Sequence, residues 1–165
     1  MLNKSLYFLL VCSLLFCCVC CSGPSGSDSP ERYTLFDITY EVPASWSSTV
    51  TSETDPDAAA CSNMHTDVRG GVDLAVDRYA ADFLGWCYVE DDPDLSNEVL
   101  FPCDYQVGSA EIPGSYYKSD EGFFVYMYEV TFDPAYYRLT FTLQKNDDRH
   151  LAEMHAVLDS LKAVD

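Results

Sequence analysis

Residues 123–143 read FFVYMYEVTFDPAYYRLTFTL and give the strongest strand signal in the chain. Apolar and polar residues alternate on both sides of the turn sequence DPA at 133–135, as in two antiparallel strands joined by a hairpin. In the first of these strands Phe123, Val125 and Met127 make the second face apolar as well. The pattern therefore predicts a central strand that is covered on both sides.

Shorter segments upstream alternate in the same way and predict further antiparallel strands. They lie near 38–42, 61–68, 72–77 and 110–118. Gly70 and Gly71 separate the second and third of these segments and predict a tight hairpin turn. Pro113 and Gly114 weaken the last one. Residues 80–109 show no clear period and are expected to be largely irregular.

The period changes at the end of the chain, where Leu151, Met154, Leu158 and Leu161 recur at helical spacing. Residues 146–148 (Asn-Asp-Asp) are expected to cap this helix, and Lys162 is expected to lie in its last turn. These elements predict an α+β domain in which an antiparallel sheet of about six strands is covered by a long C-terminal helix.

The composition limits the classes of partner. The 165 residues include 27 acidic and 9 basic side chains, a formal charge of −18, and 48% are hydrophobic. This apolar fraction suits one globular domain with a genuine core. A strongly negative surface repels phosphate, so we expect no nucleic-acid partner and no electrostatic docking on anionic lipid.

The N-terminus has the layout of an export signal. Lys4 precedes an apolar run over residues 6–21, and the flexible sequence SGPSGS follows at 22–27. The end of the run resembles the cleavage site of bacterial lipoproteins, with Cys21 as the preferred acylated residue and Cys20 as the second choice. We therefore expect a lipoprotein-type signal peptide at 1–21, a flexible spacer at 22–32 and a single domain at 33–165. Simple secretion and an uncleaved membrane anchor are the alternatives.

Lipidation predicts a protein that is anchored on the extracytoplasmic face of the cell membrane. Outside the reducing cytosol, Cys61, Cys87 and Cys103 can form one disulfide, and the Cys87–Cys103 pair would close a turn-rich segment. The alternative is that all three are small buried residues without a bond.

Acidic and aromatic residues supply the candidate binding sites. Glu90, Asp92 and Asp94 alternate in an acidic loop and could form a weak cation site; a solvated loop is the alternative. Twelve tyrosines include the adjacent pairs 116–117 and 136–137. In strands each pair places one ring outward, which gives either a binding face or ordinary cross-strand aromatic pairs.

The histidines suggest no metal centre. His150 and His155 lie five residues apart on the predicted helix and so point to different sides. We expect His155 to be a packing residue next to the apolar stripe, and His65, which alternates with Met64 and Thr66, to be exposed. No catalytic residue, metal ligand or cofactor motif is recognised in the sequence.

Several motifs together resemble the Mog/PsbP-like domains found in many bacterial surface lipoproteins. These motifs are YEVPASW at 40–46, the central aromatic strand, YYRLTFT at 136–142 and LDSL at 158–161. The resemblance covers residues 33–163. It implies an antiparallel sheet between helices, and accessory, assembly or ligand-binding roles without a shared catalytic chemistry.

These observations favour a non-enzymatic lipoprotein that binds an unknown protein or small ligand at the cell envelope. Its contact surface would be an aromatic sheet face or the acidic loop. The alternative is an exported hydrolase of envelope material, in which a nucleophile should meet a base within a cleft.

Overall fold

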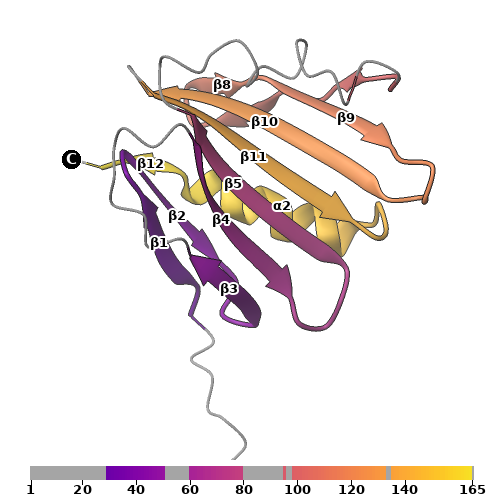
Figure 1. Ribbon diagram of the computed structural model, residues 1–165, viewed down its shortest axis with the longest axis horizontal. Helices are drawn as coiled ribbons and strands as arrows, with labels where there is room; N and C mark the ends of the chain where they lie inside the picture. The colour runs from indigo at the N-terminus through magenta and orange to yellow at the C-terminus, as the bar shows by residue number, and fades with distance from the viewer. Residues whose placement is uncertain (1–28, 51–59, 80–94, 96–97, 133–134, 165) are drawn as a thin grey trace, which may run out of the picture.

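The computed structural model describes residues 29–50, 60–79, 95, 98–132 and 135–164, a mostly β structure with one helix near the C-terminus (Figure 1). All strand pairs in these ranges are antiparallel. Within the same ranges, no helix is long and apolar enough to cross a membrane.

The largest sheet has seven strands in the order β3-β4-β5-β11-β10-β9-β6 (Figure 1). Its members are β3 (Trp46–Val50), β4 (Ala60–Asp67), β5 (Val72–Tyr79), β6 (Phe101–Pro102), β9 (Gly114–Lys118), β10 (Phe124–Phe132) and β11 (Ala135–Leu143). Strands β10 and β11 pair from Phe124–Leu143 to Phe132–Ala135. Strand β10 lies between β9 and β11, so the predicted central position of the first strand in the 123–143 segment is confirmed.

Two smaller sheets accompany the large one. The first has the order β1-β2-β12 and the second consists of β7 and β8. Their strands are β1 (Glu31–Leu35), β2 (Ile38–Val42), β12 (Lys162–Ala163), β7 (Tyr105–Val107) and β8 (Ala110–Ile112). Strand β1 begins two residues before the predicted domain start at 33.

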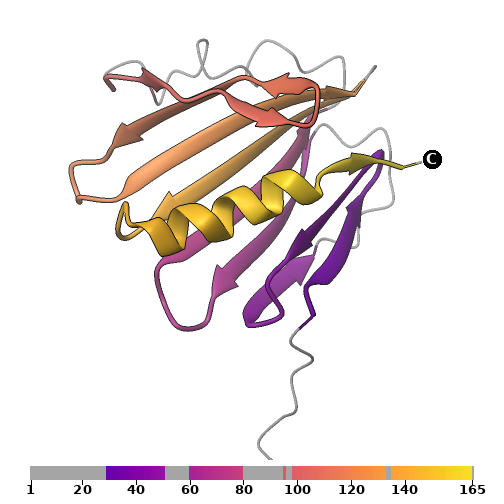
Figure 2. The same ribbon diagram turned by 180° about the vertical axis from the view of Figure 1, so that it is seen from behind.

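The helix α2 (Asp148–Ser160) lies across one face of the seven-stranded sheet (Figure 2). Asp147 is its N-cap and accepts a hydrogen bond from the backbone N–H of His150 at 3.0 Å, as the cap prediction requires. In Figure 2 the helix runs between the β1–β2 hairpin and the β7–β8 hairpin. The two small sheets therefore border the helix on either side.

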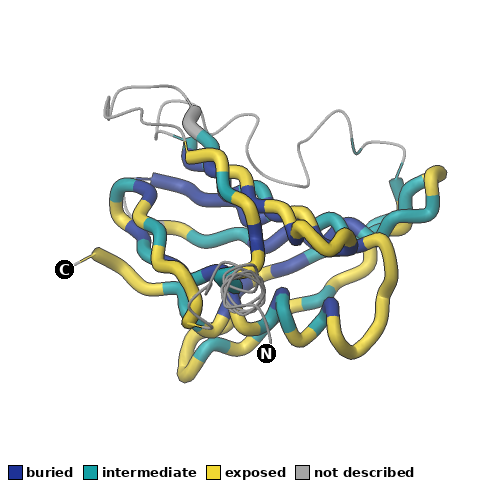
Figure 3. Tube along the Cα trace, turned by 90° about the horizontal axis from the view of Figure 1, so that it is seen from below, coloured by how far each residue is buried: buried dark blue, intermediate teal, exposed yellow. Residues whose placement is uncertain are grey.

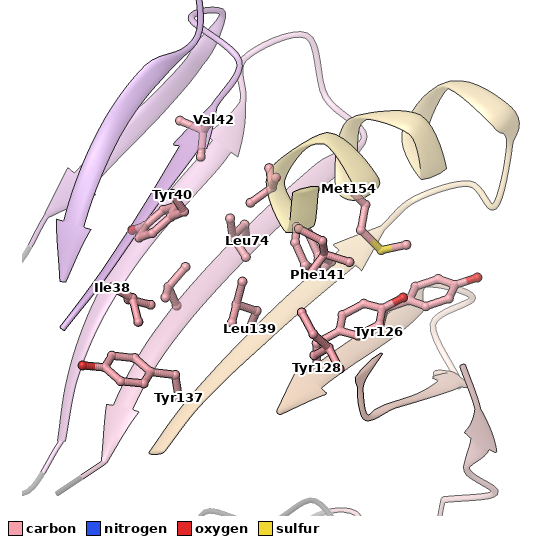
Figure 4. Packing of buried hydrophobic residues seen from close by; sticks show 14 of the residues in the cluster. Ile38, Tyr40, Val42, Leu74, Tyr126, Tyr128, Tyr137, Leu139, Phe141 and Met154 are labelled. Atoms are coloured by element: carbon pink, nitrogen blue, oxygen red, sulfur yellow. The ribbon is translucent and has the colours of Figure 1, made fainter. Parts of the chain in front are cut away.

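The main core lies between this sheet face and the helix (Figures 3 and 4). Tyr40, Leu74, Tyr128, Phe141 and Met154 are each at most 2% exposed and come from four strands and α2. On the opposite face of β10, Val125 and Met127 are also buried and contact partly buried residues of other segments. The prediction that this strand is covered on both sides is confirmed.

The β4–β5 hairpin turns at the predicted Gly-Gly pair. Gly70 has φ +77° and its N–H donates to the carbonyl of Asp67 at 2.8 Å. Gly71 has φ +139°, and a Cβ atom there would lie 2.3 Å from Nε2 of His150. The second glycine is therefore required both by its backbone angle and by close contact with the helix.

Three details of the predicted fold differ from the structure. The expected sheet of about six strands is a seven-stranded sheet with two smaller ones. The helix is short, at 13 residues, and Lys162 lies after it in β12. Strands of two or three residues are too short to show a period, and alternation does not reveal which sheet a strand joins.

Candidate functional site

A pocket of about 460 Å³ lies where β8 meets the ends of β10 and β11. Its lining residues are Ala110, Glu111, Ile112, Pro113, Glu129, Val130, Thr131 and Tyr136. Ile112 is 6% exposed and Tyr136 is 2% exposed. Ala110, Glu111, Pro113 and Thr131 are exposed, so only part of the lining is firmly packed; the volume lies in the range that small-molecule sites usually occupy.

One wall is fixed by the residues that interrupt the predicted 110–118 strand. Pro113 has no N–H to donate, and the strand is divided there into β8 and β9. The carbonyl of Pro113 instead accepts from the N–H of Glu129 at 3.0 Å. Gly114 is buried, and a Cβ atom there would lie 2.7 Å from the ring of Tyr128. The break in the strand thus holds β8 against β10.

The lining is mostly apolar, with a few polar groups. Ala110, Ile112, Pro113 and Val130 supply apolar surface. The charged residues of the lining, Glu111 and Glu129, are both acidic, and the hydroxyl of Tyr136 donates a hydrogen bond to the Glu129 carboxylate. Apolar walls with a few oriented polar groups suit ligand binding, in which the polar groups set orientation.

Five of the ten tyrosines in the described residues are buried, and the alternative of ordinary aromatic packing accounts for them. Tyr40, Tyr126, Tyr128, Tyr136 and Tyr137 are buried. The prediction that one ring of the 136–137 pair is exposed is therefore wrong, because both rings are buried. At the sheet edge a row of rings remains, in which Tyr116 stacks on Tyr126 with ring centres 5.1 Å apart and is tilted against the half-exposed Phe101 with ring centres 5.4 Å apart.

A buried polar chain connects the three-stranded sheet to the seven-stranded sheet. The hydroxyl of Tyr40 lies 2.8 Å from Nε2 of His65 and accepts from Nδ2 of Asn63 at 2.9 Å. Nδ1 of His65 lies 2.8 Å from Oγ of Ser48, and the ring of Tyr33 is 4.6 Å from the imidazole. Both ring nitrogens of His65 therefore have partners.

The prediction that His65 is exposed is wrong, since its exposed fraction is 0%. Asn63 and Asp67 on the same side of β4 are also buried, whereas Met64 on the other side is 46% exposed. The polar side of this strand faces inward because Tyr40 of the three-stranded sheet and Arg149 of α2 supply polar partners for it. Burial lowers the pKa of His65 to about 4, so the ring is neutral near pH 7.

Ser48 and His65 form the nucleophile–base pair that the hydrolase alternative calls for, but the hydrogen-bond directions oppose it. Because the Tyr40 hydroxyl accepts from Asn63, its proton points to Nε2 of His65. The neutral ring then carries its own proton on Nδ1 and donates it to Ser48. In this tautomer His65 cannot take a proton from Ser48, and a base of such low pKa is weak.

Four charged residues join the β4–β5 hairpin to α2. The Asp67 side chain is fully buried and pairs with Arg69 and Arg149, each at 3.0 Å. Both arginines also contact Glu153, at 3.0 and 3.2 Å. Burial alone would raise the pKa of Asp67, but the two arginines outweigh it and the pKa is lowered. The cluster is closed and neutral, which fits a structural role.

The sequence-predicted site residues lie mainly outside the described residues. This holds for Cys21 and Cys20, for Cys87, and for Glu90, Asp92 and Asp94. Cys103 is described and half-buried, and burial raises its pKa to about 11. The Cys87–Cys103 disulfide and the cation site stay predictions.

The helical histidines separate as expected. His155 is partly buried and stacks on Tyr105 at 4.6 Å, which confirms its packing role. His150 is buried against Gly71. Among the residues that the structure covers, no group of three or more side chains is arranged to hold a metal ion.

Comparisons with known proteins identify the fold. No family model matches the sequence. No curated protein matches it either. The solution structure of cyanobacterial PsbP (CyanoP) from Synechocystis sp. PCC 6803 matches with a TM-score of 0.58 at 13% identity, over 88% of this chain and 99% of that one. A crystal structure from Bacteroides thetaiotaomicron VPI-5482 matches with a TM-score of 0.47 at 11% identity, over 78% and 45%. The domain has the PsbP-like fold that its motifs predict.

Proposed function

We propose that this PsbP-like domain belongs to a lipid-tethered, non-catalytic binding protein on the extracytoplasmic face of the cell membrane. The observation that supports it best is the pocket between β8 and the ends of β10 and β11. Its mostly apolar lining, which includes the buried Ile112 and Tyr136, is typical of ligand sites, and its polar groups are too few for acid–base chemistry on their own.

The number of residues between Cys21 and the first strand is compatible with a tether. Residues 22–30 separate Cys21 from the start of β1 at Glu31. A chain of that length spans roughly 30 Å when extended. Acylation at Cys21 would therefore hold the domain close to the bilayer surface while leaving it free to turn.

Palmitate labelling in a bacterial host tests the tether. We expect label in the wild-type protein and in Cys103→Ser, which serves as a matched control, and no label in Cys21→Ala. Retained label in Cys21→Ala that disappears in Cys20→Ala would move the site by one residue. An unlabelled wild-type protein released into the medium would contradict the tether.

The pocket can be tested with a small set of fragments, because the chain contains two isoleucines, Ile38 and Ile112. Ile112 lines the pocket, whereas Ile38 is fully buried in β2 of the three-stranded sheet. A spectrum of isoleucine δ1-methyl groups thus contains one reporter and one internal control. We expect fragments that bind to shift Ile112 and leave Ile38 unchanged; a set in which no fragment shifts Ile112 would contradict a ligand role for the pocket.

The Ser48–His65 contact supports one other candidate function, an exported hydrolase. A fluorophosphonate probe labels a serine that is activated by a neighbouring base. The hydrolase predicts labelling that Ser48→Ala abolishes and Ser47→Ala preserves. We expect the wild-type protein to stay unlabelled, since the His65 tautomer gives its proton to Ser48.

A further inference from the structure

We infer that the turn between β4 and β5, with Val68 at its tip, faces the bilayer and contacts the lipid headgroups. This inference rests on the proposed tether at Cys21. It adds the face of the domain that meets the membrane, which the spacer by itself leaves open. It follows from where the chain enters the domain, from what the turn exposes and from how the charges around the turn are balanced.

The strand register places the start of β1 at the same end of the domain as this turn. Glu31 is the first residue of β1 and lies opposite the last residue of β2. A tight turn follows β2, in which the N–H of Trp46 donates to the carbonyl of Pro43 at 2.9 Å. Trp46 is the first residue of β3 and lies opposite Asp67, the last residue of β4. The turn 68–71 and the start of β1 therefore lie at one end, the lower edge in Figure 1.

An exposed apolar side chain marks this end. Val68 is 66% exposed at the tip of the turn. Val99 is also largely exposed, but it precedes β6, the outermost strand at the other edge of the seven-stranded sheet. The half-exposed Val164 donates its N–H to the carbonyl of Asp37 at 2.8 Å, at the opposite end of β1 from Glu31. Of these three valines, Val68 is the one at the end where the chain enters the domain.

The tip is held in place from inside the domain. The N–H of Gly70 donates to the carbonyl of Asp67 at 2.8 Å, and the N–H of Arg69 donates to its carboxylate at 3.0 Å. The same carboxylate is fully buried and pairs with Arg149 of α2. Val68 is thus presented on a turn that is fixed to the helix, so contact with a surface costs little conformational freedom.

The charges around the tip suit a layer of headgroups. Arg69 and Arg149 balance the carboxylates of Asp67 and Glu153. Each arginine bonds through Nε and Nη2, which leaves Nη1 to donate to an acceptor outside the cluster, and each side chain is 49% exposed. Guanidinium groups bind the phosphate of a headgroup well.

The tether is what brings the turn to the bilayer. The chain has a net charge of −18, so an anionic surface repels the domain as a whole. Once acylation holds the domain at the surface, the end with balanced carboxylates, exposed arginines and an apolar tip is the one least repelled.

Paramagnetic relaxation from the bilayer surface tests the orientation. The acylated protein is placed in nanodiscs of phosphatidylcholine and phosphatidylglycerol in which some headgroups carry a gadolinium chelate, and the relaxation of valine methyl groups is measured. The enhancement falls steeply with distance, and a strand of eight residues such as β4 is roughly 26 Å long. We therefore expect the enhancement at Val68 to exceed that at Val164 about tenfold, and to exceed that at Val99 as well.

Two variants separate contact at the tip from the tether alone. Val68→Asp and Val164→Asp each add one negative charge at an exposed position. Two buried residues at opposite ends of β2 report the orientation in both variants, Val42 beside the start of β1 and Ile38 away from it. We expect Val68→Asp to lower the ratio of the enhancement at Val42 to that at Ile38 about twofold, and Val164→Asp to leave it unchanged.

The outcomes distinguish the orientation from the tether. If the protein comigrates with the nanodiscs but Val68 and Val164 relax equally, the orientation is overturned and the tether stands. If both variants change the ratio alike, or neither changes it, contact at Val68 is overturned. A protein that separates from the nanodiscs overturns the tether and the orientation with it.

Discussion

The hydroxyl of Tyr40 and Nε2 of His65 form a hydrogen bond 2.8 Å long that joins the three-stranded sheet to the seven-stranded sheet. Both residues are 0% exposed. The bond therefore connects two sheets through groups that have no access to water, and its loss would leave polar atoms buried.

Replacing this hydroxyl should destabilise the domain. Tyr40→Phe leaves Nε2 of His65 and Nδ2 of Asn63 without their shared partner, and we expect a loss of about 2 kcal/mol in the free energy of unfolding. Urea denaturation measures this. Tyr105→Phe is the matched control, because its hydroxyl donates to the exposed Asp159 at 3.1 Å, and it should change stability by less than about 0.5 kcal/mol. Equal losses of stability in the two variants would contradict a larger contribution from the buried polar chain.

The stability of the domain should depend on pH through His65. Its pKa is about 4 in the folded protein and 6.5 in the reference state, so the unfolded chain takes up a proton first as the pH falls. The free energy of unfolding should therefore decrease between about pH 6.5 and 4, by about 3 kcal/mol from this residue, and level off below.

A difference experiment isolates this contribution. Burial raises the pKa of Asp77, which acts in the opposite direction in part of the same range. Comparing the wild-type protein with His65→Gln over pH 7 to 4 removes the effect of Asp77. Parallel stability curves for the two proteins would contradict the assignment to His65.

The two hairpin glycines should differ in their tolerance of a methyl group. Gly70→Ala places a side chain in open space at φ +77° and should cost about 1 kcal/mol. Gly71→Ala adds a contact of 2.3 Å with His150 at φ +139°, where non-glycine residues are strained. We expect it to cost at least about 2 kcal/mol more. Thermal unfolding of both variants measures the difference, and equal melting temperatures would refute the close contact.

The buried carboxylate of Asp67 should contribute more to the stability of the domain than an ion pair at the surface. Asp67→Asn removes the buried negative charge between Arg69 and Arg149, which then share only Glu153, and should lower the free energy of unfolding by about 3 kcal/mol. Glu41→Gln breaks the exposed pair with Arg32 and should cost less than about 1 kcal/mol. Denaturation at pH 7 compares them, and a larger effect of Glu41→Gln would contradict the burial argument.

Much of the secondary structure is readable in the sequence. The 123–143 segment, the Gly70–Gly71 turn and the helical stripe are each local patterns, and the structure contains the corresponding hairpins and helix. The Asp147 cap was also predictable, because a short acidic side chain before a helix accepts from its free N–H groups. These features depend on residues that are close in sequence.

The candidate sites were harder to predict from the sequence than the secondary structure. The pocket combines residues 110–113, 129–131 and 136, which come together only through the break at Pro113 and the pairing of β10 with β11. No single stretch carries its signal. The acidic loop, by contrast, has a conspicuous sequence but lies outside the described residues.

The sequence by itself determined which residues share a face of each strand, because side chains alternate with the backbone. Only the tertiary structure decided what covers each face. On β4 the polar side became the buried one, since the three-stranded sheet brings Tyr40 to His65, while Met64 on the other side stayed exposed. Burial is a property of the surroundings, and these were supplied by residues 25 positions away in the chain.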